Sequence, residues 1–85
     1  MAWLITKDFI DFGEMNGERW SYKDLTDEQI EKICVHKFRL LDDDGEVYFE
    51  GLSSDSSSFA ALDMFGSGYG CTDIQYYEDG RWRSL

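Results

Sequence analysis

The sequence predicts a single α+β domain over residues 1–85: a small antiparallel sheet of about four to five strands, two hairpins among them, with one main helix packed on one face. Three observations predict this class. Two Asp-Gly turns lie between β-rich runs, a strong helix start follows an N-terminal β-rich run, and 16% of the 85 residues are aromatic. Because 42% of the residues are hydrophobic, the chain has enough apolar surface to fold, which excludes a disordered acidic tail.

The first strand and the main helix lie in the N-terminal half. Residues 4–12 mix β-branched and aromatic side chains and are predicted to form the strand. Thr26 and Gln29 have the spacing of a capping box, so the helix is predicted to begin after Thr26. Three apolar residues fall on one face of this helix: Ile30, Ile33 and Cys34.

Two hairpins and a second, short helix complete the predicted fold. Their segments are a strand over 38–41, a strand over 46–51, a helix over 59–65, a strand over 71–77 and a return strand from 81. Gly45 and Gly80 close the two hairpins, because glycine adopts a positive φ at low cost.

The aromatic and apolar residues divide into two sets. The expected core residues are Phe38, Val47, Phe49, Ile74 and Tyr76. The other set exceeds what one small core takes: Trp3, Trp20, Tyr69, Tyr77 and Trp82. These residues either cover sheet edges or form an interface, where Trp and Tyr are favoured.

The formal net charge of -10 is concentrated in the second half of the chain. Residues 40–80 hold ten Asp and Glu and no Lys or Arg. Nucleic-acid binding needs Lys and Arg side chains to contact the phosphates, so we expect no direct binding of nucleic acid. The acidity has two open explanations, which are solubility and a surface that binds a basic partner.

The cysteines and the N-terminus indicate a reduced, cytoplasmic protein. Cys34 and Cys71 are too few and too far apart for a disulfide framework. No apolar run approaches the roughly 20 residues of a membrane span, and the N-terminus lacks the pattern of a signal peptide.

No motif for catalysis, metal binding or a cofactor is recognised. Aligning Gly45 with position 6 of an EF-hand loop leaves Leu40 and Gly51 at two ligand positions, so the run over 42–45 is interpreted as a solvated turn. Cys34 and His36 point to different sides of a helix, which argues against a zinc pair. We therefore expect no catalytic residue, no metal and no cofactor.

Several segments resemble a family of short, acidic, uncharacterised bacterial proteins. They cover residues 3–8, 38–51, 70–74 and 80–82 and the final Leu85. Members of this family often have a Gly- and Pro-containing stretch after the first strand, whereas this chain has no proline. The resemblance implies a bacterial cytoplasmic protein, or one from a phage or another mobile element, and it transfers no activity and no functional residue.

These observations predict a non-enzymatic, acidic protein-interaction module, an inhibitor or modulator that binds a basic surface by imitating nucleic-acid charge. The expected partner-binding residues are Asp42, Asp43, Asp44, Glu46, Glu50, Tyr77 and Trp82. One alternative is a structural or accessory protein that self-associates, so that both a monomer and a homodimer stay open. The other alternative is a small metal-dependent enzyme.

Overall fold

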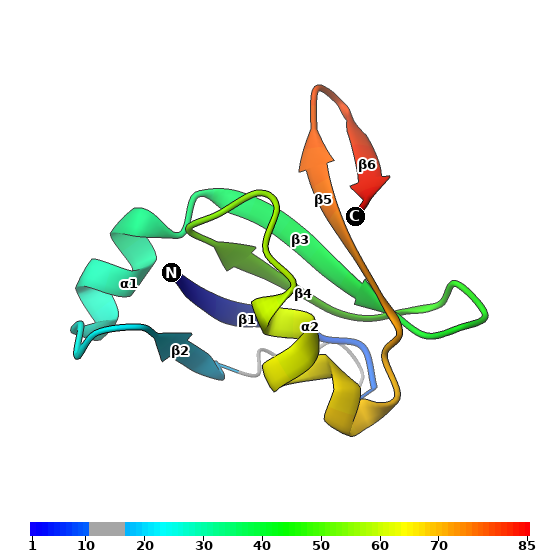
Figure 1. Cartoon of the computed structure of the whole chain (residues 1–85), viewed down its shortest axis with the longest axis horizontal. Helices are drawn as coiled ribbons and strands as arrows, with labels where there is room; N and C mark the ends of the chain where they lie inside the picture. Colours follow the sequence, from blue (N-terminus) through cyan, green and yellow to red (C-terminus); the bar gives the residue numbers. More distant parts are fainter. Residues whose placement is uncertain (11–16) are drawn as a thin grey trace.

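The computed structural model describes residues 1–10 and 17–85. Its elements are β1 (Ala2–Asp8), β2 (Arg19–Ser21), α1 (Asp27–Ile33), β3 (His36–Leu41), β4 (Val47–Ser53), α2 (Ala60–Met64), the 3-10 helix η1 (Gly66–Tyr69), β5 (Asp73–Glu78) and β6 (Arg81–Ser84). The strands form one antiparallel sheet in the order β2-β1-β4-β3-β5-β6 (Figure 1). The predicted α+β class with an antiparallel sheet is confirmed.

The finer description of the fold needs correction. The described sheet has six strands instead of four to five. The short helix expected over 59–65 is present as α2, and the expected main helix is α1, which has only 7 residues, so the described sheet packs against two short helices rather than one main helix. The unexpected strand is β2, whose three residues are too few to show an alternating pattern. The expected strand over 4–12 instead runs over β1, and residues 11 and 12 lie outside the described part of the chain.

Helix α1 begins as its capping signal predicts. The Thr26 hydroxyl accepts a hydrogen bond from the Gln29 backbone N–H at 3.2 Å, and the Gln29 side chain accepts one from the Thr26 N–H at 2.8 Å. Ile33, the last residue of the helix, is 43% exposed, so the prediction that it shares the buried face of Ile30 and Cys34 is wrong. No helix in the described chain has the length and apolar character of a membrane span.

The two helices pack on opposite faces of the sheet, because alternate residues of β1 point to opposite sides. Trp3 and Ile5 belong to a cluster that includes Ala61 of α2. Ala2 and Leu4 belong to a second cluster, which includes Ile30 and Cys34 from α1 and the residue after it. The prediction of a helix on only one face is therefore wrong.

The expected core is largely confirmed. Phe38, Phe49, Ile74 and Tyr76 are fully buried, whereas Val47 is half-buried. Trp3 is buried in the larger cluster, so it does not contribute to a surface. Both hairpin glycines have the expected positive φ, 82° at Gly45 and 81° at Gly80.

Candidate functional site

The acidic run after β3 forms the turn that joins β3 to β4. One Asp42 carboxylate oxygen accepts hydrogen bonds from the backbone N–H groups of Asp44 at 3.0 Å and Glu46 at 2.8 Å. The hydrogen bond from the Glu46 N–H is the main cause that holds the pKa of Asp42 below its usual value. Asp42 is therefore an ionised part of the turn itself.

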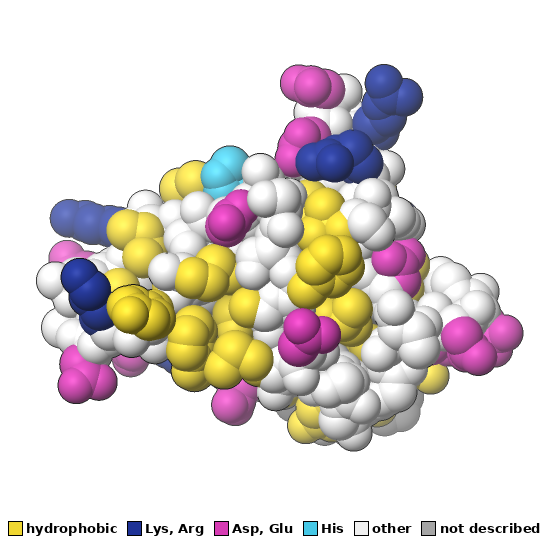
Figure 2. All heavy atoms as spheres, in the orientation of Figure 1, with side chains coloured by type: hydrophobic (Ala, Val, Ile, Leu, Met, Phe, Trp, Pro, Cys, Tyr) yellow, Lys and Arg dark blue, Asp and Glu magenta, His cyan; other side chains and the backbone are white. Residues whose placement is uncertain are grey.

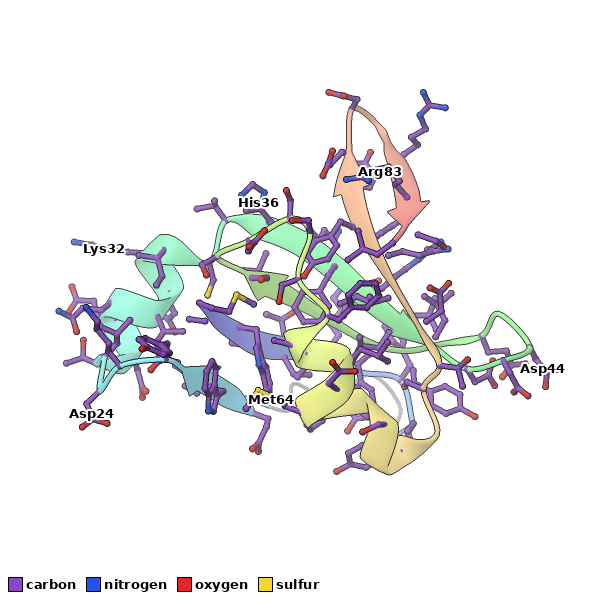
Figure 3. The ribbon with its side chains drawn as sticks, in the orientation of Figure 1. Asp24, Lys32, His36, Asp44, Met64 and Arg83 are labelled. Atoms are coloured by element: carbon purple, nitrogen blue, oxygen red, sulfur yellow. The ribbon has the colours of Figure 1, made fainter. Side chains whose placement is uncertain are left out.

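The other acidic side chains of the turn have no such role. Asp43, Asp44 and Glu46 are exposed, and no described residue forms a hydrogen bond or an ion pair with their carboxylates. Figure 3 shows Asp44 at the tip of the turn, pointing away from the sheet. The turn thus holds three free carboxylates on a fixed backbone.

Two more carboxylates lie at the same end of the sheet. Here β1 and β3 end while β4 and β5 begin, so Asp8 lies opposite Phe49 and Asp73 lies opposite Leu41. We call the resulting group the acidic end, which consists of Asp8, Asp42, Asp43, Asp44, Glu46 and Asp73. In Figure 2 the tip of the turn carries Asp and Glu side chains without Lys or Arg beside them on the visible face.

Aromatic residues that the sequence did not single out as a group border the acidic end. The Phe9 backbone N–H donates to the Tyr48 carbonyl at 2.9 Å, and the Phe9 side chain is 43% exposed. The Tyr69 ring lies 5.0 Å from the Phe49 ring and is half exposed. We call Phe9, Tyr48 and Tyr69 the aromatic border. The hydrogen bond between Phe9 and Tyr48 joins β1 to β4, and η1 places Tyr69 against Phe49, the residue opposite Asp8. Both placements depend on contacts between segments far apart in the sequence, so spacing gave no signal.

Tyr77 and Trp82 lie elsewhere, on the sheet face formed by β3, β5 and β6. Their rings contact each other at 5.2 Å between centroids. The Arg39 guanidinium lies 4.3 Å from the Trp82 ring centroid, and the Lys37 ammonium lies 5.8 Å from it. These four residues form a cation–aromatic cluster that is separate from the acidic end.

Glu50 belongs with this cluster rather than with the turn. Its carboxylate lies 3.9 Å from the Lys37 ammonium and is only 18% exposed. The Arg39 side chain is also held by a 2.7 Å hydrogen bond to the Gln75 amide oxygen. The structure therefore divides the seven expected partner-binding residues into four at the acidic end and three beside cations of the same chain.

The three adjacent aspartates are the one group of acidic, histidine or cysteine side chains in the described chain whose ligand atoms could hold a metal ion. One carboxylate oxygen from each of Asp42, Asp43 and Asp44 lies within 4.8 Å of the others. Calcium takes about six to eight oxygen ligands, and the Asp42 oxygen already accepts two backbone hydrogen bonds. The run is therefore better described as a charged turn than as a metal centre.

Neither cysteine has the surroundings of a nucleophile. Cys34 and Cys71 are both free and buried, in different clusters of the core. Burial raises the pKa of Cys71 to about 11, and it also raises the pKa of Cys34. Both groups are therefore neutral thiols near pH 7, and the thiolate is the reactive form.

Comparisons with protein-family models, curated proteins and solved structures give no match. The resemblance to short acidic bacterial proteins stays an expectation, and the function is inferred from the surface chemistry of the chain itself.

Proposed function

We propose that this chain is a non-enzymatic, cytoplasmic interaction module that binds a basic surface of a partner protein through its acidic end. The observation that carries the proposal is that the acidic residues of the β3–β4 turn have different roles. Asp42 fixes the backbone, which leaves the carboxylates of Asp43, Asp44 and Glu46 exposed and unpaired among the described residues. Charges on a fixed backbone lose little conformational freedom when they bind.

The surroundings of the turn support a partner with both basic and apolar groups. Carboxylates at the rim accelerate the encounter with a basic surface, because charge complementarity acts mainly on the association rate. Phe9 and Tyr69 are about half exposed, and they contact Tyr48 and Phe49, in the strand that follows the turn. They offer apolar area from which water is displaced on binding. A surface of this kind fits an inhibitor or modulator that imitates nucleic-acid charge.

The first test is to identify the partner by affinity capture from a bacterial lysate. The bait is the full chain, and the control bait is the variant D43N/D44N/E46Q, which keeps the Asp42 hydrogen bonds of the turn. We expect a basic protein, or one with a basic nucleic-acid site, to be retained by the wild type and lost by the variant. An acidic partner, or equal capture by both baits, would contradict the proposal.

A matched variant distinguishes an effect of where the charges lie from an effect of the total charge. D24N/E28Q/D79N removes the same three charges from exposed positions outside the acidic end. Asp79 has a φ of 51°, a conformation that asparagine also tolerates, so this substitution suits the β5–β6 turn. We expect this variant to retain the partner. Loss in both variants would show that only the net charge matters.

A further inference from the structure

Strand β6 lies at one edge of the sheet, beside β5 alone. Figure 1 shows the β5–β6 hairpin projecting from the body of the molecule, with no other drawn element along the outer side of β6. A free edge exposes a row of backbone N–H and C=O groups that can pair with another strand. The sequence of this edge and its register decide which partner fits.

The register identifies the free backbone groups. The turn of Asp79 and Gly80 joins Glu78 to Arg81, and in a two-residue hairpin this closing pair is hydrogen-bonded. Since the pattern alternates, Arg83 points its backbone groups toward β5, and the Leu85 N–H does so too, donating to the Ile74 carbonyl at 3.3 Å. The N–H and C=O groups of Trp82 and Ser84 therefore point away from the sheet.

The side chains of this edge differ on the two faces. Arg81 and Arg83 lie on one face, where Arg83 forms a 2.9 Å ion pair with Glu78 and Arg81 has no described partner. Trp82 lies on the other face beside Arg39. A surface hollow of about 280 Å³ also lies at this hairpin, lined by Glu78, Asp79, Arg81, Trp82 and Arg83. Figure 2 shows Lys and Arg side chains in dark blue on this projection, together with Asp and Glu side chains in magenta.

We propose that β6 receives an added strand from a partner protein, an extended segment in which acidic and apolar residues alternate. Alternation along the added strand sets its acidic side chains beside Arg81 and Arg83 and its apolar side chains beside Trp82. The segment also satisfies the free backbone groups of Trp82 and Ser84, which is how strand addition gains affinity. This surface is separate from the acidic end, so the inference does not rest on the proposed function.

The charges favour such a segment over a second copy of the same strand. Antiparallel pairing of two β6 strands centred on Trp82 sets Arg81 opposite the Arg83 of the second copy. Like charges directly opposite each other across strands are destabilising. An acidic segment makes opposite-charge pairs at these same positions. The whole chain is acidic, and Glu78 and Asp79 lie in the same hairpin. The Debye length at physiological salt is only about 8 Å, so the charges of Arg81 and Arg83, which flank the added strand directly, contribute most.

The test is an NMR titration of the full, ¹⁵N-labelled chain with two capped synthetic peptides. One peptide alternates Glu and Val over six residues, and the other has Lys in place of each Glu. We expect the Glu peptide to shift the amide signals of Trp82 and Ser84 and to protect both amides from hydrogen exchange. The Lys peptide should bind about tenfold more weakly, the factor for one lost opposite-charge pair replaced by a like-charge pair.

Ser84 offers a matched pair of variants. Ser84→Pro removes one outward N–H, which an edge strand tolerates, whereas Ser84→Ala keeps it. Both variants lose the hydroxyl bonds to Gln75 and Asp73, so only the backbone donor differs. We expect the proline variant to bind the Glu peptide about fivefold to tenfold more weakly than the alanine variant, the cost of one hydrogen bond.

A charge reversal keeps the test valid if the proline disturbs the hairpin. The variant R81E/R83E should prefer the Lys peptide over the Glu peptide. The inference is overturned if the shifted amides lie outside β6, if wild type does not distinguish the peptides, or if the reversal leaves the preference unchanged. It is also overturned if neither peptide binds, because the arginines would then only protect the edge from pairing.

Discussion

Asp42, Asp43 and Asp44 are adjacent residues of one type, but they have different roles. Asp42 accepts the backbone hydrogen bonds that close the turn, while the next two carboxylates stand free at its tip. The sequence predicted a charged turn here, since Asp and Gly are common turn residues. It could not tell which aspartate holds the turn, because that depends on the direction of each side chain.

The role of Asp42 leads to a prediction on stability. Asp42→Ala should lower the urea midpoint at pH 7, whereas Asp43→Ala should leave it nearly unchanged. Folding lowers the pKa of Asp42, so its contribution is present above the unfolded value near 3.8 and is lost as the pH falls through the folded value. The difference between the two variants should therefore shrink when the unfolding is repeated at progressively lower pH below 3.8. Equal midpoints at pH 7 would contradict the assigned role.

Cys71 gives a second prediction, at the alkaline end. Its pKa rises on folding from 9.0 to about 11, because the buried thiolate would lose its hydration. The stabilising contribution of the neutral thiol is present below pH 9 and is lost as the pH rises to 11, by roughly 2–3 kcal/mol for a shift of this size.

The check is the free energy of unfolding between pH 8 and pH 11 for wild type and Cys71→Ala. At pH 8 the alanine variant should have the lower free energy of unfolding, because the substitution leaves a small cavity. Its free energy of unfolding should then fall less steeply than that of wild type as the pH rises to 11. The control is thiol labelling without reductant, which should find two free cysteines after denaturation and very slow labelling before it. Parallel curves for the two proteins would refute the buried neutral thiol.

Some elements of the fold could be predicted from local sequence signals, whereas others could not. The cap of α1 and the two Asp-Gly hairpins were predicted correctly because each depends on residues a few positions apart. Strand β2 was missed because its pairing with β1 comes from distant residues. The cation–aromatic cluster was missed for the same reason, since it needs β3, β5 and β6 to be neighbours.

Gly51 in the middle of β4 also shows what sequence spacing does not reveal. A Cβ placed at Gly51 would overlap the carbonyl oxygen of Leu4 and lie 2.6 Å from the Phe38 ring. The glycine is therefore required by a close approach between β1, β4 and the core ring of β3, although its own φ is not positive.

We expect Gly51→Ala to lower the free energy of unfolding by about 1–3 kcal/mol or more, as for other overpacked core sites. Gly68→Ala is the matched control, because a Cβ there meets no atom within 4 Å and its φ is not positive. Chemical denaturation of the two variants measures the difference. A Gly51→Ala protein as stable as Gly68→Ala would show that the packing of β4 is looser than described.

In the molecule as a whole, acidic side chains and cationic side chains gather on different parts of the sheet. At the acidic end, the exposed carboxylates of Asp43, Asp44 and Glu46 have no partner among the described residues. Lys37 and Arg39 lie instead with Tyr77 and Trp82, on the sheet face formed by β3, β5 and β6. The distribution of charge along the sequence predicted an acidic surface, and Tyr77 and Trp82 were expected to belong to it. The fold instead pairs these aromatics with cations, and the acidic end is bordered by other aromatic residues.

The most direct test of this division is the salt dependence of the association rate with the captured partner. Surface-plasmon kinetics between about 50 and 300 mM salt span Debye lengths of roughly 14 to 6 Å. Three proteins are compared: wild type, D43N/D44N/E46Q and D24N/E28Q/D79N. For wild type and the second variant, we predict that association slows strongly as salt rises. For the first variant, association should already be slow at low salt and should change little. Equal salt dependence in both triple variants would contradict the claim that the acidic end is the binding surface.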